Sequence, residues 1–195
     1  MLGSNGGAPD LQHILRTFAC IAGKIRALPL CENYDETKVL PLIEYILSLN
    51  PPRPEKIPDP GSVASGRALF RKSCFGCHNG PGFATIEVHD PLSIGTDPNI
   101  VRLVDPAGTG MAVYSVLTPE EITKGVRARR LTAVWSLGRL FHNGGASSLA
   151  EVFCLDGPRA ESSMGPGHST AGHSFTCQGP SGEEKRNLIA FLESL

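Results

Sequence analysis

The residues whose identity and spacing most clearly indicate chemistry are Cys74, Cys77 and His78, which form a Cys-x-x-Cys-His run. This spacing is typical of two thiols attached to the vinyl groups of one haem, with the following His as an axial ligand of the iron. A redox dithiol or half of a zinc site is the alternative, but a zinc site needs a second Cys/His pair at comparable spacing, which the sequence lacks. The run therefore predicts one covalently bound haem c.

The other cysteines are expected to form disulfides. Bacterial c-type haem is attached outside the cytoplasm, in an oxidising environment where disulfides persist, so we expect a periplasmic or extracellular protein. The first residues, MLGSNGGAPD, lack the charged n-region and the apolar h-region of a secretory signal. The signal is therefore expected to have been removed, or to belong to a part of the chain not present in this sequence. The four cysteines outside the haem motif are Cys20, Cys31, Cys154 and Cys177.

Composition narrows the class of protein. Lys and Arg number 18 and Asp and Glu 19 among 195 residues, so the net charge is −1 and no basic excess favours nucleic-acid binding. No stretch approaches about 18 consecutive apolar residues, so no membrane span is expected. The chain holds 22 Gly and 16 Pro, and hydrophobic residues make up 41%. We therefore expect long loops around a core that the haem helps to fill.

Apolar periodicity and capping residues predict the elements that position the haem motif. An i, i+3, i+4 stripe over 11–21, preceded by Asp10, predicts one helix, and apolar residues over 42–47 predict a second that ends before Pro51. A short helix is predicted at 66–70, directly before the motif. No alternating run is long enough for a strong strand, so the expected fold class is mostly α with much coil. Capping boxes begin at Thr118, Ser148 and Ser181, the last opening a helix with Leu188, Phe191, Leu192 and Leu195 on one face.

The chain also contains an internal repeat. Residues 5–14 resemble 143–152, since each segment has Asn-Gly-Gly-Ala followed by two spaced apolar residues, and residues 42–49 resemble 188–195. The second match aligns Cys31 with Cys177, and Cys20 and Cys154 occupy corresponding places. We therefore expect two disulfides that each close a local loop, Cys20–Cys31 and Cys154–Cys177.

The repeat predicts the domain organisation. Residues 1–50 are expected to be a partial cytochrome-like helical unit without a haem motif. Residues 51–62 are expected to be a Pro-rich linker. Residues 63–195 are expected to form a complete mono-haem cytochrome c domain.

The segment GRALFRKSCFGCH at 66–78 resembles the opening of c-type cytochrome domains. More specifically, residues 66–195 resemble the bacterial di-haem cytochrome c peroxidase superfamily, and its rubber-oxygenase-like branch most closely. The haem motif and His142-Asn143-Gly144 are the most specific parts of the match. Members of the family carry two haems, whereas this sequence has a single Cys-x-x-Cys-His run. The other matching segments are 93–98, 131–135, 140–146 with Leu149, 171–175 and 183–195.

The resemblance implies a cytochrome c-like helical domain wrapped by long Gly/Pro-rich loops. In such domains a Gly and an aromatic residue of the first helix, here Gly66 and Phe70, pack against an aromatic residue of the last helix, here Phe191. The resemblance also implies His173 as the second axial ligand, because Gly172-His173 matches a Gly-His before the last helix. The other candidates for that position are Met164, His168 and Met111.

Ligation of the iron determines the function that we expect. With His78 and His173 as ligands, the protein is expected to be an electron-transfer cytochrome with a redox partner protein. The alternative is a haem peroxidase or oxygenase component. It would be the electron-transfer half of a di-haem enzyme whose first haem lies on a missing segment or on another subunit contacting residues 1–50. An enzyme also needs a general acid or base near the iron, for which His142 is the weak candidate.

Overall fold

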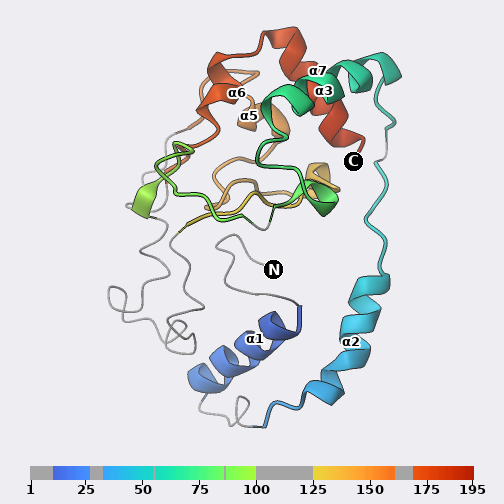
Figure 1. Cartoon of the computed structure of the whole chain (residues 1–195), viewed down its shortest axis with the longest axis vertical. Helices are drawn as coiled ribbons and strands as arrows, with labels where there is room; N and C mark the ends of the chain where they lie inside the picture. Colours follow the sequence, from blue (N-terminus) through green and yellow to red (C-terminus); the bar gives the residue numbers. More distant parts are fainter. Residues whose placement is uncertain (1–10, 27–32, 55, 86, 100–124, 161–168) are drawn as a thin grey trace.

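The structure is a computed structural model that describes residues 11–26, 33–54, 56–85, 87–99, 125–160 and 169–195 (Figure 1). Within these ranges the protein is mostly α-helical, as the sequence predicts, and has no strand. The helices are α1 (Leu11–Arg26), α2 (Glu36–Ser48), α3 (Pro60–Ser73), α5 (Leu149–Val152), α6 (Ser174–Gln178) and α7 (Gly182–Glu193), with short 3-10 turns η1 (Pro81–Phe83) and η5 (Val134–Ser136).

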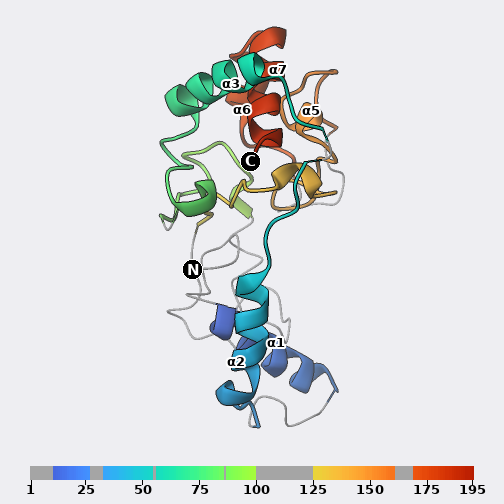
Figure 2. The ribbon, with the colours of Figure 1, turned by 90° about the vertical axis from the view of Figure 1, so that its right-hand side faces the viewer.

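Helices α3 and α7 pack against each other and form the centre of the core (Figures 1 and 2). Phe70 of α3 and Phe191 of α7 are each only 2% exposed, and their ring centroids lie 5.1 Å apart. Gly66 permits this close approach, because a Cβ atom there would lie 1.9 Å from the backbone oxygen of Asn187. The predicted packing of Gly66 and Phe70 against Phe191 is therefore confirmed.

Helix α3 begins earlier than the apolar pattern predicts. The Asp59 carboxylate caps it by accepting a hydrogen bond from the backbone N–H of Ser62 at 2.8 Å. Pro60 occupies the first turn, where its missing N–H has no intrahelical partner to lose. The last residues of the expected linker 51–62 are therefore helical.

Helix α7 begins as predicted, with a complete capping box. The Ser181 hydroxyl accepts from the Glu184 N–H at 3.3 Å, and the Glu184 carboxylate accepts from the Ser181 N–H at 2.8 Å. The box expected at Ser148 forms only in part, because the Glu151 carboxylate accepts from Ser147 instead. The predicted caps Asp10 and Thr118 lie outside the described residues.

Helices α1 and α2 contact each other and lie apart from α3, α5, α6 and α7 in both views (Figures 1 and 2). Helix α2 starts at Glu36, before the predicted apolar residues, because the Asp35 carboxylate accepts from the Thr37 N–H at 3.0 Å. No residue of α2 is buried. Its apolar side chains therefore remain largely exposed. Within the described ranges, no helix is long and apolar enough to span a bilayer.

Candidate functional site

Helix α3 carries the Cys-x-x-Cys-His run at its carboxyl end. Cys74 is the C-cap residue, and its amide donates to the carbonyl of Phe70 at 2.8 Å. The amides of Cys77 and His78 both donate to the carbonyl of Cys74, at 3.2 and 2.9 Å. A single turn of chain therefore presents both thiols and the imidazole, and all three residues are half-buried.

The His78 ring is oriented by a hydrogen bond from Nδ1 to the carbonyl oxygen of Phe83, at 2.7 Å. A carbonyl only accepts, so Nδ1 carries the proton and Nε2 of the neutral ring keeps its lone pair. Burial lowers the pKa of His78, although the carbonyl groups of Phe83 and Arg129 oppose the change. The ring is therefore neutral at pH 7, which is the form that binds metals.

The Cys74 thiol differs from the reactive thiol of a redox dithiol. Burial, reinforced by the neighbouring Cys77, raises the pKa of Cys74 to about 11, whereas reactive Cys-x-x-Cys pairs have a lowered pKa. The described part of the chain also contains no group of three or more His, Cys, Asp or Glu that could hold a metal ion. Within the described residues, nothing therefore supports reading the Cys-x-x-Cys-His run as a redox dithiol or as part of a zinc site.

The imidazole of His173, which precedes α6, lies near that of His78. The two ring centroids are 6.5 Å apart and their planes are inclined by 39°. Two imidazoles that bind one metal ion from opposite sides have centroids about 6.3 Å apart, because each metal–nitrogen bond is about 2.0 Å long. The separation of His78 and His173 therefore fits two axial ligands of one ion. The alternative ligands Met164 and His168, and also Met111, lie outside the described residues.

Aromatic rings surround His173. The centroids of Phe141 and Phe175 lie 5.8 and 5.7 Å from that of its imidazole. The residue as a whole is exposed to water, but the neighbouring aromatic rings solvate a charge on its imidazole poorly. Burial, followed by repulsion from His78 and Arg159, lowers the pKa of His173 to about 4. This ring is therefore also neutral at pH 7.

Two loops that are distant in sequence hold the segment 169–173, which carries His173. Thr96 donates through Oγ1 to a carbonyl of this segment at 3.1 Å, and the Asp97 carboxylate accepts one of its amides at 3.2 Å. Asn143 donates through Nδ2 to another of its carbonyls, also at 3.1 Å. Gly172 has φ 111°, and a Cβ atom there would lie 3.0 Å from Thr96 Oγ1. The close packing of these loops thus requires glycine at position 172.

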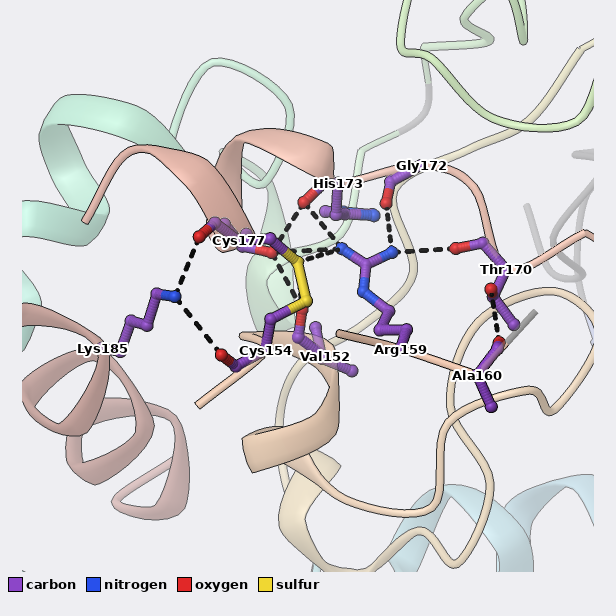
Figure 3. Close-up of a disulfide and its surroundings, with 10 residues drawn as sticks. Val152, Cys154, Arg159, Ala160, Thr170, Gly172, His173, Cys177 and Lys185 are labelled. Carbon is purple, nitrogen blue, oxygen red and sulfur yellow. Dashed lines mark hydrogen bonds between the residues drawn. A yellow bond between two sulfur atoms is a disulfide. The ribbon is translucent and has the colours of Figure 1, made fainter. Parts of the chain in front are cut away.

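Sequence reasoning did not single out Arg159. Its guanidinium donates to the carbonyl oxygens of Thr170, Gly172 and His173, at 2.8, 2.6 and 2.9 Å (Figure 3). The residue lies in the coil after α5, and these partners are 11 to 14 residues away. No local pattern marks such a contact, so only the tertiary structure identifies it.

A disulfide joins Cys154 and Cys177, as the repeat predicts. It links the end of α5 to α6, the helix that begins directly after His173. Lys185 of α7 is 8% exposed, and its ammonium group donates to the carbonyl oxygens of Cys177 and Cys154, at 2.9 and 3.4 Å (Figure 3). Cys20 is also disulfide-bonded, and its predicted partner, Cys31, lies outside the described residues.

His142, the weak catalytic candidate, is half-buried in a loop closed by backbone hydrogen bonds between Leu140 and Ala146. It follows Phe141, whose ring lies 5.8 Å from that of His173. His142 is therefore the chain neighbour of a residue whose ring lies beside the candidate ligand, and its catalytic role stays a prediction.

Comparison of the chain with protein-family models, with curated proteins and with solved structures finds no match.

Proposed function

We propose that this protein is a c-type cytochrome that carries one covalently bound haem and transfers electrons. The observation that carries the proposal is the pair His78 and His173, two neutral imidazoles whose centroids are 6.5 Å apart, with His78 directly after the Cys-x-x-Cys pair. The resemblance of residues 66–195 to cytochrome domains of the di-haem cytochrome c peroxidase superfamily supports the same function.

The residues of the site have defined roles in this proposal. Cys74 and Cys77 would hold the haem through thioether bonds to its two vinyl groups. His78 would offer Nε2 to the iron, because the hydrogen bond from Nδ1 to Phe83 orients the ring. His173 would supply the second nitrogen ligand of the iron. When bound, the haem supplies one-electron redox chemistry.

Two protein ligands favour electron transfer, because they leave no open iron position for peroxide or dioxygen. Phe75, between the two cysteines, is 45% exposed, so this turn lies at the surface, where a redox partner protein can approach. The disulfide Cys154–Cys177 is compatible with the oxidising compartment that haem attachment requires. A periplasmic or extracellular location is therefore part of the proposal.

The first test is expression of the chain together with a bacterial c-type haem attachment system. We expect about one haem per chain that survives denaturing electrophoresis, and the spectrum of the reduced pyridine complex should indicate two thioether bonds. The Cys74→Ser/Cys77→Ser variant should lose covalent haem. Absence of covalent haem, while a known cytochrome c is loaded in the same cells, would contradict the proposal.

The second test concerns the distal ligand. The ferric protein should give the optical and EPR spectra of low-spin iron with two imidazole ligands, and His173→Ala should convert it to high-spin iron. The ferrous His173→Ala protein should also bind carbon monoxide faster than the wild type. A wild type with a high-spin spectrum that His173→Ala leaves unchanged would refute the ligand assignment and favour an enzyme.

A second candidate function is the electron-transfer half of a di-haem peroxidase or oxygenase, and the exposed apolar face of α2 favours it. In the repeat, Leu42 and Tyr45 align with Leu188 and Phe191 of α7, which are 3% and 2% exposed in the core. Leu42 and Tyr45 themselves are 46% and 62% exposed. A haem-bearing subunit or segment that contacts residues 1–50 through a helix resembling α3 would cover this face.

The composition of the native assembly tests this candidate. We expect a second haem in the complex isolated from the producing organism, and Tyr45→Glu should release it, whereas the exposed Thr37→Glu control should not. A native assembly with a single haem for each copy of this chain would contradict the di-haem function and leave the cytochrome proposal intact.

A further inference from the structure

Arg159 connects the backbone of the His173 segment to the aromatic wall beside it. Its Nη1 atom donates to the carbonyl oxygens of Thr170 and Gly172, and its Nη2 atom donates to that of His173 (Figure 3). The same Nη2 atom lies 3.4 Å from Thr176 Oγ1 and 3.1 Å from the Cys177 sulfur. The guanidinium group of Arg159 therefore binds the backbone carbonyl groups both before and after the Cα atom of His173.

The backbone conformation explains why the carbonyl groups of Thr170 and Gly172 need a donor. Gly172 and His173 both have positive φ, at 111° and 50°, so neither residue continues a helix or a strand. Thr170 and Gly172 are buried, and buried carbonyl groups without a donor are costly. Arg159 supplies that donor, and a guanidinium group can serve several acceptors in one plane, which an ammonium group cannot.

The guanidinium group also contacts the ring beside His173. The Arg159 Cζ atom lies 4.8 Å from the centroid of Phe141, within the range of a cation–π contact. The Phe141 ring in turn lies 5.8 Å from the imidazole of His173. Arg159 thus restrains the backbone of His173 and one of the side chains against which its ring rests.

We propose that Arg159 is a positioning residue that holds the His173 imidazole at the separation from His78 that a second axial ligand requires. This inference rests on the proposed function, because it assigns a role toward the haem iron. In the wild type, the restrained loop keeps the imidazole within bonding distance. Without Arg159, the loop samples positions in which His173 is too distant to bind.

The test compares haem-loaded wild-type protein with Arg159→Ala, Arg159→Lys and His173→Ala. The readouts are the fraction of high-spin ferric iron and the rate at which the ferrous protein binds carbon monoxide, which requires the distal ligand to leave. Loss of charge-assisted hydrogen bonds should raise this rate roughly tenfold to a hundredfold in Arg159→Ala. Arg159→Lys should lie between that variant and the wild type, because lysine keeps the charge but not the planar fork.

Arg139→Ala is the matched control. Arg139 is exposed and donates one long hydrogen bond, 3.5 Å, to the carbonyl of Gly144, so its loss should leave both readouts unchanged. All variants are compared at a temperature where circular dichroism shows them folded. If Arg159→Ala does not fold, Arg159→Lys and Arg159→Gln provide the test, since each keeps a donor but loses the planar cationic fork.

The outcomes separate the two proposals. If His173→Ala is high-spin while the Arg159 variants keep the wild-type spectrum and carbon monoxide rate, the positioning role is overturned and the cytochrome remains. A change in stability alone, with no change in either readout, also overturns it. If the chain takes up no covalent haem, or if His173→Ala matches the wild type, the proposed site itself fails.

Discussion

Gly66→Ala is expected to destabilise the protein by about 2 kcal/mol, because the added methyl group has no space. A Cβ atom at position 66 would lie 1.9 Å from the backbone oxygen of Asn187 and 2.9 Å from Cβ of Phe191. Backbone atoms cannot move aside as a side-chain tip can. Helices α3 and α7 must therefore separate by about 1 Å, which disturbs a core packed as closely as a crystal.

Two opposing effects determine how much Gly66→Ala lowers the free energy of unfolding. Overpacking of a core costs typically about 1–3 kcal/mol, and the rigid backbone contact places this site at the upper end. Alanine gains back about 1 kcal/mol over glycine through its higher helix propensity. The net loss of about 2 kcal/mol corresponds to a decrease in melting temperature of about 4–8 °C for a chain of this size.

Urea unfolding followed by circular dichroism measures this difference, with wild type and variant at equal haem content. Gly182→Ala in the first turn of α7 is the control, because a Cβ atom there would make an ordinary 3.6 Å contact with Arg186. It should leave stability unchanged or raise it by up to about 1 kcal/mol. If Gly66→Ala proved as stable as Gly182→Ala, the close approach of α3 and α7 around Gly66 would be wrong.

Three further predictions concern the support of the site. Lys185→Met should cost about 1–3 kcal/mol in urea unfolding, because two partly buried carbonyl groups lose their donor; an unchanged midpoint would mean that water replaces the amine. Cys154→Ser/Cys177→Ser should lower the free energy of unfolding by about 3 kcal/mol, since the loop between the cysteines spans 23 residues; a loss near zero would count against this estimate. The haem-free chain should lose stability as pH falls from the ordinary pKa of His173, 6.5, toward its folded value of about 4, because the unfolded chain binds the proton first. Urea midpoints measured across this range should show a decrease that His173→Phe reduces, and equal pH dependence of the two proteins would contradict the assignment.

The ends of the helices show which structural features the local sequence can predict. Ser181 and Glu184 lie three residues apart, so their reciprocal hydrogen bonds depend only on that spacing, and the predicted capping box is present. The start of α3 was harder to predict, because the prolines around Asp59 read as a linker. Pro60 nevertheless suits the first turn of a helix, and Asp59 supplies the cap.

Some parts of the candidate site could likewise be predicted from the sequence alone. The Cys-x-x-Cys-His run lies on one turn after α3, so the sequence alone determined that Cys74, Cys77 and His78 stay together. The repeat likewise predicted the disulfide Cys154–Cys177 from aligned positions. Both inferences use residues that are close in the chain or related by a repeated pattern.

Only the tertiary structure decided that the ring of His173 lies 6.5 Å from that of His78, 95 positions earlier in the sequence. That separation depends on hydrogen bonds from Thr96, Asn143 and Arg159, which reach the segment 169–173 from distant loops. It also depends on the positive φ of His173, a conformation that few non-glycine residues adopt. Contacts of this kind leave no periodic trace in the sequence, because each is made once, between side chains and backbone groups that only the folded chain brings together.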